Sequence, residues 1–186
     1  MKYLGYRLPV FLWVLALAAV TMMAPTASSA AGDKGIDTDA AAALQALYSQ
    51  SDSAKTLGKA AKGVLVFPQI TKGGFIVGGH YGEGVLIVDG KQIGRYSTVQ
   101  ASYGLQAGLQ KYAYAMFFMT QEALDWLKTT KGWELGIGPS IVIVDEGAGK
   151  NFSTTTLKSE IYAFFFGQKG LMGGMGIQGT KISKMK

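Results

Sequence analysis

The sequence predicts an α+β fold in which N-terminal helices pack on a curved, glycine-rich, mostly antiparallel and partly barrel-like sheet with one inserted helix. Residues 37–62 carry apolar side chains at helical spacing, whereas from Gly63 onward short apolar runs alternate with turn residues. The chain has 26 glycines in 186 residues, about twice the usual share of roughly 7%. Most of them lie in the strand half, where glycine marks bends, bulges or close backbone approach, so a tightly curved sheet is the simplest account.

The first 30 residues have the three zones of a secretory signal peptide. Lys2 and Arg7 give a positive start, residues 8–24 are apolar and uncharged, and small residues follow. We therefore expect cleavage after Ala30 or Ala31 and a protein that is exported, periplasmic or secreted. A retained membrane anchor is the alternative, but the apolar run is slightly short of the roughly 20 residues that a spanning helix needs.

Residues 37–186 should form a single domain behind a flexible lead-in at residues 31–36. Cleavage removes the two positive charges of Lys2 and Arg7, so the formal charge of +6 falls to +4. This mild basicity suits contact with anionic surfaces, and the chain lacks the dense basic stripe that binds nucleic acid. It has no cysteine and one histidine, which excludes disulfides and leaves most metal sites without ligands.

Two helices are expected at the start of this domain. Asp37 or Thr38 should cap the first helix, and residues 51–53 interrupt it and can cap a second helix that Gly63 ends. In the first helix the apolar side chains recur every three or four residues and therefore share one face. These positions are Ala40, Leu44, Leu47 and Tyr48.

The strand half begins with the apolar run at residues 64–67, which Pro68 should end. A β-branched run at residues 85–88 predicts the next strand. Asp89 and Gly90 follow it directly and predict a tight hairpin, because both central positions of that turn need positive φ.

Residues 96–110 alternate between apolar and polar side chains, as strands do. Residues 112–119 are apolar on both faces and should be buried, and the combined length requires a bend or bulge near Lys111. Thr120 should cap the inserted helix at residues 121–129. Two further strands are expected at residues 136–144 and 161–166.

The sequence offers no catalytic constellation, so we expect a non-enzymatic protein without cofactor or metal. It lacks the serine elbow of hydrolases and the phosphate loop of nucleotide-binding proteins. His80 lies near Glu83, but a fitted, hydrogen-bonded histidine is expected there rather than a catalytic base. Asp145 and Glu146 fit an ordinary acidic turn, because a calcium loop supplies further carboxylates. The aromatic residues of the later strands fit core packing, with an acyl-chain pocket as the alternative.

A row of lysines is the most informative polar signal. Lys55, Lys59 and Lys62 fall on one face of the second helix, with Leu57 roughly opposite, and Lys72 follows shortly after. Such a row can bind the phosphate groups of lipid headgroups. A solvated helix face without any ligand is the alternative.

Several short motifs occur along the chain in a fixed order, and with them the sequence resembles the SYLF lipid-binding family. Each motif is weak alone, but together they span residues 40–184, which makes the resemblance specific. The motifs are Gly63-Val-Leu-Val-Phe-Pro, Lys72-Gly-Gly-Phe, Gly79-x-Tyr81-Gly-Glu-Gly84, Tyr96-Ser, Gly104-Leu-Gln-Ala-Gly108, Phe117-Phe-Met-Thr-x-Glu-Ala-Leu124, Gly132-Trp-Glu, Gly147-Ala-Gly149, Tyr162-Ala-Phe and Gln168-Lys-Gly-Leu-Met172.

The resemblance implies a non-enzymatic module that binds membrane lipid through an N-terminal amphipathic helix and nearby basic residues. Eukaryotic members are endocytic adaptors that bind phosphoinositides, of phosphatidylinositol type, and in some cases actin, whereas bacterial members are exported. This chain lacks the partner domains of the eukaryotic adaptors, so actin binding is not supported. An exported protein does not normally meet phosphoinositides, so anionic phospholipid in general is the expected partner.

We therefore expect headgroup contacts from Lys55, Lys59, Lys62 and Lys72. The apolar side chains of the same region should enter the membrane interface or cover a lipid pocket. The alternative is a structural or protein-interaction module of the cell envelope that has no lipid ligand and docks its amphipathic helix on its own sheet. The expected apolar contacts are Leu44, Leu47, Tyr48 and Leu57.

Overall fold

A computed structural model describes residues 29–74, 77–103, 108–144, 158–169 and 179–186. Most of the predicted signal peptide and the predicted acidic turn at Asp145 and Glu146 lie outside these residues. The elements are α1 (Ser29–Gln50), α2 (Asp52–Ala60), β1 (Gly63–Gly74), β2 (Val77–Val88), β3 (Lys91–Tyr103), β4 (Gly108–Phe118), α3 (Gln121–Thr129), β5 (Trp133–Glu134), β6 (Ile141–Val144), β7 (Ile161–Lys169) and β8 (Thr180–Lys184).

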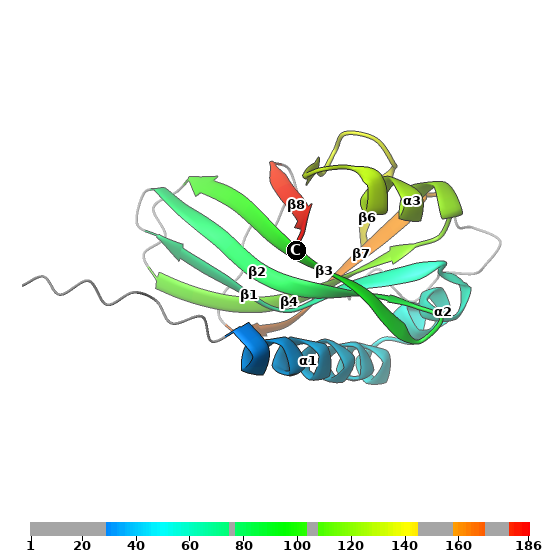
Figure 1. Ribbon diagram of the computed structural model, residues 1–186, viewed down its shortest axis with the longest axis horizontal. Helices are drawn as coiled ribbons and strands as arrows, with labels where there is room; N and C mark the ends of the chain where they lie inside the picture. The colour runs from blue at the N-terminus through cyan, green and yellow to red at the C-terminus, as the bar shows by residue number, and fades with distance from the viewer. Residues whose placement is uncertain (1–28, 75–76, 104–107, 145–157, 170–178) are drawn as a thin grey trace, which may run out of the picture.

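The strands form one curled sheet in the order β5-β8-β3-β2-β1-β4-β7-β6. Every neighbouring pair is antiparallel except β6 and β7, which run parallel. The predicted α+β class with a mostly antiparallel, partly closed sheet is therefore confirmed. Helix α1 lies along one side of the curled sheet, and α3 lies on the other side (Figure 1).

Both faces of the central strands are buried, each in its own core. In β4, Tyr114, Met116 and Phe118 pack toward α3, whereas Ala115 and Phe117 pack toward α1 and α2. This explains why residues 112–118 are apolar at every position, as the sequence analysis expected for a buried segment. We call the two sets the α3-side core and the α1-side core.

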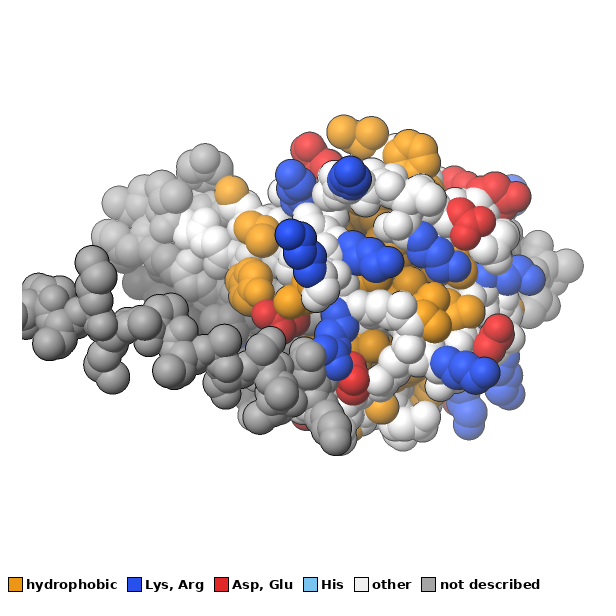
Figure 2. All heavy atoms as spheres, in the orientation of Figure 1, with side chains coloured by type: hydrophobic (Ala, Val, Ile, Leu, Met, Phe, Trp, Pro, Cys, Tyr) orange, Lys and Arg blue, Asp and Glu red, His pale blue; other side chains and the backbone are white. Residues whose placement is uncertain are grey.

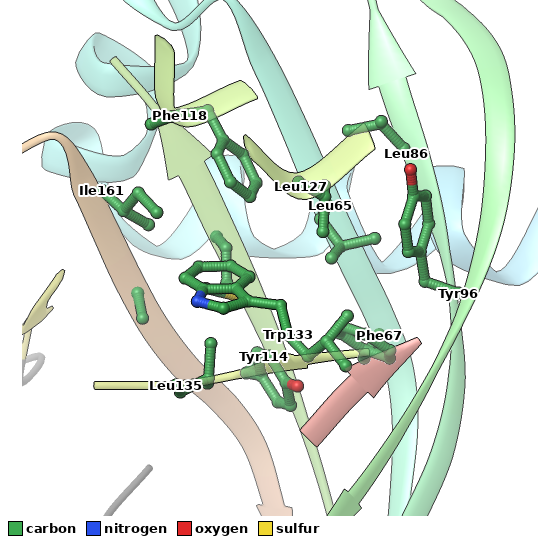
Figure 3. Packing of buried hydrophobic residues seen from close by; sticks show 14 of the residues in the cluster. Leu65, Phe67, Leu86, Tyr96, Tyr114, Phe118, Leu127, Trp133, Leu135 and Ile161 are labelled. Atoms are coloured by element: carbon green, nitrogen blue, oxygen red, sulfur yellow. The ribbon is translucent and has the colours of Figure 1, made fainter. Parts of the chain in front are cut away.

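The α3-side core is built around Trp133, whose ring lies among Phe118, Leu127 and Tyr114 (Figure 3). The indole Nε1 donates a hydrogen bond of 2.8 Å to the carbonyl oxygen of Ile137, so its polar atom is satisfied although the side chain is buried. A satisfied tryptophan at this position fixes the turn after β5 and the place of α3 above the sheet.

Local sequence signals are confirmed at four places. The hydroxyl of Ser51 accepts from the amide of Ala54 at the start of α2, and Thr120 caps α3 in the same way. Asp89 and Gly90 adopt φ values of 50° and 72°, as the hairpin signal requires. The β4–β7 register shifts just after Lys111, where a bulge was expected.

The first helix begins earlier than predicted, at Ser29, so residues 31–36 are helical rather than a flexible lead-in. Asp37 therefore lies inside α1 and does not cap it. Its carboxylate instead accepts hydrogen bonds from Arg95 of β3, with distances of 3.2 Å to Nε and 2.8 Å to Nη2. The expected cap was wrong because α1 begins at Ser29, well before Asp37, so neither Asp37 nor Thr38 stands at a helix start.

Pro68 does not end the first strand, contrary to expectation. The registers of β1 with both β2 and β4 shift across this residue, so Pro68 lies in a bulge, where its missing N–H is not needed. Strand β1 then continues to Gly74. In β2, Gly84 faces the bulge, and a Cβ there would lie 2.6 Å from the ring of Phe67.

Three other boundaries differ from the sequence prediction. The alternating run 96–110 belongs to two strands, β3 and β4, that do not pair with each other. The polar Thr98 of β3 is buried, whereas the apolar Val99 is 52% exposed. Only Ile141–Val144 of the expected strand 136–144 is extended in the sheet, because glycines before it adopt positive φ. Helix α2 ends at Ala60, so Gly63 starts a strand instead of ending a helix.

Candidate functional site

The predicted lysine row lies on and just beyond α2. Lys55 and Lys59 are exposed and one helical turn apart, and Lys62 is exposed two residues after the helix ends. Within the described part of the chain no carboxylate forms an ion pair with any of the three. Three exposed lysines that form no ion pair therefore lie within one short segment of the chain, residues 55–62.

Lys72 is not part of this group. It lies near the far end of β1, ten residues after Lys62, a separation of roughly 30 Å along an extended strand. The residue is half-buried, and it lies directly opposite His80 in the pairing of β1 with β2. Burial lowers the pKa of the His80 imidazole, and the positive charge of Lys72 lowers it further.

The apolar residues expected to contact lipid pack on the protein itself. Leu47 and Leu57 are fully buried and Leu44 is 7% exposed, all in the α1-side core. Tyr48 is half-buried, and its ring lies 6.3 Å from that of Phe117. In this fold the four side chains cover the sheet, and entry into a membrane requires α1 and α2 to leave it.

A polar clasp that sequence reasoning missed holds the N-terminal half of α1 on the sheet. Arg95 and Asp37 form a two-point ion pair with a shortest distance of 2.8 Å, and Gln92 donates to the Asp37 carbonyl oxygen at 3.0 Å. The residues come from α1 and β3, and nothing local in the sequence links them. Only the fold reveals this contact.

The one histidine is fitted and hydrogen-bonded, as expected. His80 Nδ1 lies 2.7 Å from the Tyr112 hydroxyl, whereas Glu83 accepts a 2.7 Å bond from Tyr81 instead. The cavity beside His80 has a volume of about 10 Å³, which is space for one water. It is far below the roughly 300 Å³ of ordinary ligand pockets, so the neighbouring aromatic rings act here as core.

Among the described residues there is no cluster of three potential metal ligands. In the same part of the chain no helix is both long and apolar enough to cross a bilayer.

A second group of lysines was not identified from the sequence. Lys128 and Lys131, at the end of α3, line a groove of about 460 Å³ together with Lys181 and Lys184 of β8. Basic side chains gather on the face that Figure 2 shows. Some 50 residues separate the two pairs in the chain, so no spacing pattern could have joined them.

Residues 99–186 match the family model Ysc84, described as "Las17-binding protein actin regulator". No curated protein sequence matches the chain. The match starts within β3 and runs to the end of β8, so the groove lysines lie inside it. Lys55, Lys59 and Lys62, which we call the α2 lysines, precede the matched residues, and so does Lys72.

Proposed function

This chain belongs, through residues 99–186, to the Ysc84 (SYLF) domain family, and from that premise we propose that it is an exported, non-enzymatic domain that attaches peripherally to anionic phospholipid surfaces. The observation that carries the proposal is the group of three exposed, unpaired lysines at α2. Their ligand is the phosphate of a lipid headgroup.

The fold supports this role by fixing the lysines in place. Leu57 anchors α2 in the α1-side core, so the helix presents Lys55 and Lys59 from a rigid base. Each lysine near an anionic surface contributes about 1 kcal/mol, and three of them strengthen binding by roughly 100-fold. Such binding is reversible and falls with added salt, because the Debye length shortens to about 8 Å at physiological ionic strength.

The buried leucines have a structural part in this proposal. They cover the sheet and hold the helices, so affinity comes from the lysine surface and not from inserted apolar side chains. Lys72 makes at most a separate contact, because it lies at the other end of β1.

Vesicle sedimentation tests the proposal. The protein is mixed with vesicles of phosphatidylcholine alone or with phosphatidylglycerol, and the bound fraction is measured at low and high salt. A Lys55→Glu, Lys59→Glu, Lys62→Glu variant is compared with a control that reverses three exposed lysines elsewhere. The control changes are Lys91→Glu, Lys111→Glu and Lys158→Glu.

We expect the α2 variant to lose at least tenfold more affinity for the anionic vesicles than the control, which has the same net charge. Equal losses of vesicle affinity in the two variants would mean that Lys55, Lys59 and Lys62 do not form the binding surface. Binding of the wild type to both vesicle types alike, without salt dependence, would argue against headgroup recognition.

Export is tested separately, because it rests on the pattern of the first 30 residues. Expression in a bacterium with the intact N-terminus should give a periplasmic or secreted protein whose N-terminal residue is Ala31 or Gly32. Full-length protein that stays in the cytoplasm would contradict this part of the proposal.

A protein-interaction module is the second candidate, favoured by the description of the matched family model. Sedimentation with actin filaments separates the two candidates. We expect no co-sedimentation with filaments, since nothing in the chain beyond that description supports actin binding. Filament binding without vesicle binding would favour the second candidate.

A further inference from the structure

The groove between the end of α3 and β8 combines charge from two distant parts of the chain. Strand β5 follows α3 closely and pairs with β8, which sets Glu134 opposite Lys181 and places Lys131 beside the same strand. The groove of about 460 Å³ is lined by eight residues, of which four are lysines. Such a density of one charge on a concave surface raises the local concentration of anions.

Nearby acidic groups leave most of this charge uncompensated. Asp125 lies 3.6 Å from Lys128, but the Asp125 side chain is exposed and that of Lys128 is only partly buried, so the pair is weak. Among the residues that the structure describes, no carboxylate lies within ion-pair distance of Lys131, Lys181 or Lys184. The end of α3 adds about half a negative charge, which one lysine offsets.

The backbone makes room for one of these lysines. Gly132 adopts φ +78°, and a Cβ there would lie 2.5 Å from Lys181 Cε, 3.3 Å from Lys181 Nζ and 3.4 Å from Ser183 Oγ. The Lys181 side chain therefore lies across Gly132, and the Lys181 ammonium and the Ser183 hydroxyl are both close to this glycine. An ammonium next to a hydroxyl donor is a suitable pair for a phosphate oxygen.

The groove and the α2 lysines lie in different parts of the molecule. Ile182 of β8 points into the α3-side core, so its strand neighbours Lys181 and Ser183 face away from that core. Figure 1 shows α3 and β8 at the top of the molecule and α2 at its lower right. The two groups of lysines are therefore separate sites.

We propose that the α3–β8 groove is a second anion-binding site that holds a phosphate group, carried either by a soluble molecule or by a lipid headgroup. Lys131, Lys181 and Lys184 supply the charge, and Ser183 donates a hydrogen bond. This assignment does not depend on the α2 surface. With both sites filled by lipid, one molecule holds two membrane surfaces together.

Titration with pyrophosphate tests the groove without any membrane. Amide NMR shifts of Gly132 and Lys181 are followed in the wild type and in a triple variant, the groove variant. The groove variant combines Lys131→Gln, Lys181→Gln and Lys184→Gln. The matched control is Lys91→Gln, Lys111→Gln and Lys158→Gln, and urea unfolding checks that each variant is folded. We expect saturable shifts at the groove that weaken at least tenfold in the groove variant and less than twofold in the control.

Vesicle clustering identifies the source of the phosphate. If the wild type clusters phosphatidylglycerol vesicles and the groove variant binds them without clustering, the ligand is a headgroup. If pyrophosphate binds and vesicles do not cluster, the ligand is soluble. Absence of both effects, or equal shifts at the control lysines, overturns the proposal, whereas loss of vesicle binding in the α2 variant alone concerns only the proposed function.

Discussion

Replacement of Leu47 by alanine separates a helix that is docked on the sheet from one that inserts into a membrane. Leu47 is fully buried between α1 and the sheet. Truncation of a buried leucine costs about 2–5 kcal/mol, a large part of the 5–15 kcal/mol that stabilises a typical domain. With a urea dependence of about 2 kcal/mol per molar, the midpoint of unfolding should fall by about 1–2.5 M.

The same packing opposes release of α1 and α2 onto a bilayer. Their departure exposes the α1-side core, including Val64, Val66, Val85 and Phe117. Exposure of each such side chain costs about 1.5–3 kcal/mol, or roughly 6–12 kcal/mol for the four. Lys55, Lys59 and Lys62 together contribute only about 3 kcal/mol on an anionic surface, so the helices should stay docked.

The assay combines urea unfolding with vesicle sedimentation, and the control is Gln45→Ala at an exposed position of α1. We expect Leu47→Ala to lose stability while its folded form binds anionic vesicles within twofold of the wild type. A loss of stability below 1 kcal/mol together with tenfold weaker vesicle binding would refute the reasoning, because Leu47 would then contact lipid and not the sheet.

Three further predictions concern the fold. Gly84→Ala should cost about 1–3 kcal/mol in urea unfolding, because the new Cβ meets Phe67 and a backbone oxygen, whereas Gly79→Ala, with its nearest atom at 3.7 Å, should cost much less. Thr120→Ala should cost about 1 kcal/mol by loss of the α3 cap, and Thr120→Ser should restore most of it. Burial lowers the pKa of His80, so the unfolded state takes up its proton first, and stability should fall as pH drops below about 6.5. His80→Gln should flatten that fall, and an unchanged pH profile would contradict the assignment.

Sequence reasoning predicted the features that depend on near neighbours. The caps at Ser51 and Thr120 and the turn at Asp89 use residues within three positions, and each was confirmed. Lys62, by contrast, was expected in the same helix as Lys55 and Lys59 but lies beyond its end. Helix caps and tight turns depend on residues that are close in the chain, so the spacing of residue types is sufficient to predict them.

Features that depend on distant contacts were missed or misjudged. The clasp of Asp37 with Arg95 changed the role of a residue that was expected to be a cap. Lys181 gains its place beside Gly132 only through the pairing of β5 with β8. Which face of an amphipathic strand is buried also depends on the sheet, as the exposed Val99 demonstrates.

The two-sided burial of β1 and β4 has a consequence for how the strands find their alignment. In most sheets a slip of one residue turns the polar face inward and is strongly penalised. A slip within residues 112–118 only replaces one apolar side chain by another, so hydrophobicity alone does not select the correct pairing. The bulge at Pro68 and the glycine opposite it at Gly84 fit together in a single alignment. Pro68 and Gly84 therefore set the register of the central strands. Their substitution should produce proteins with misaligned strands as well as a lower free energy of unfolding.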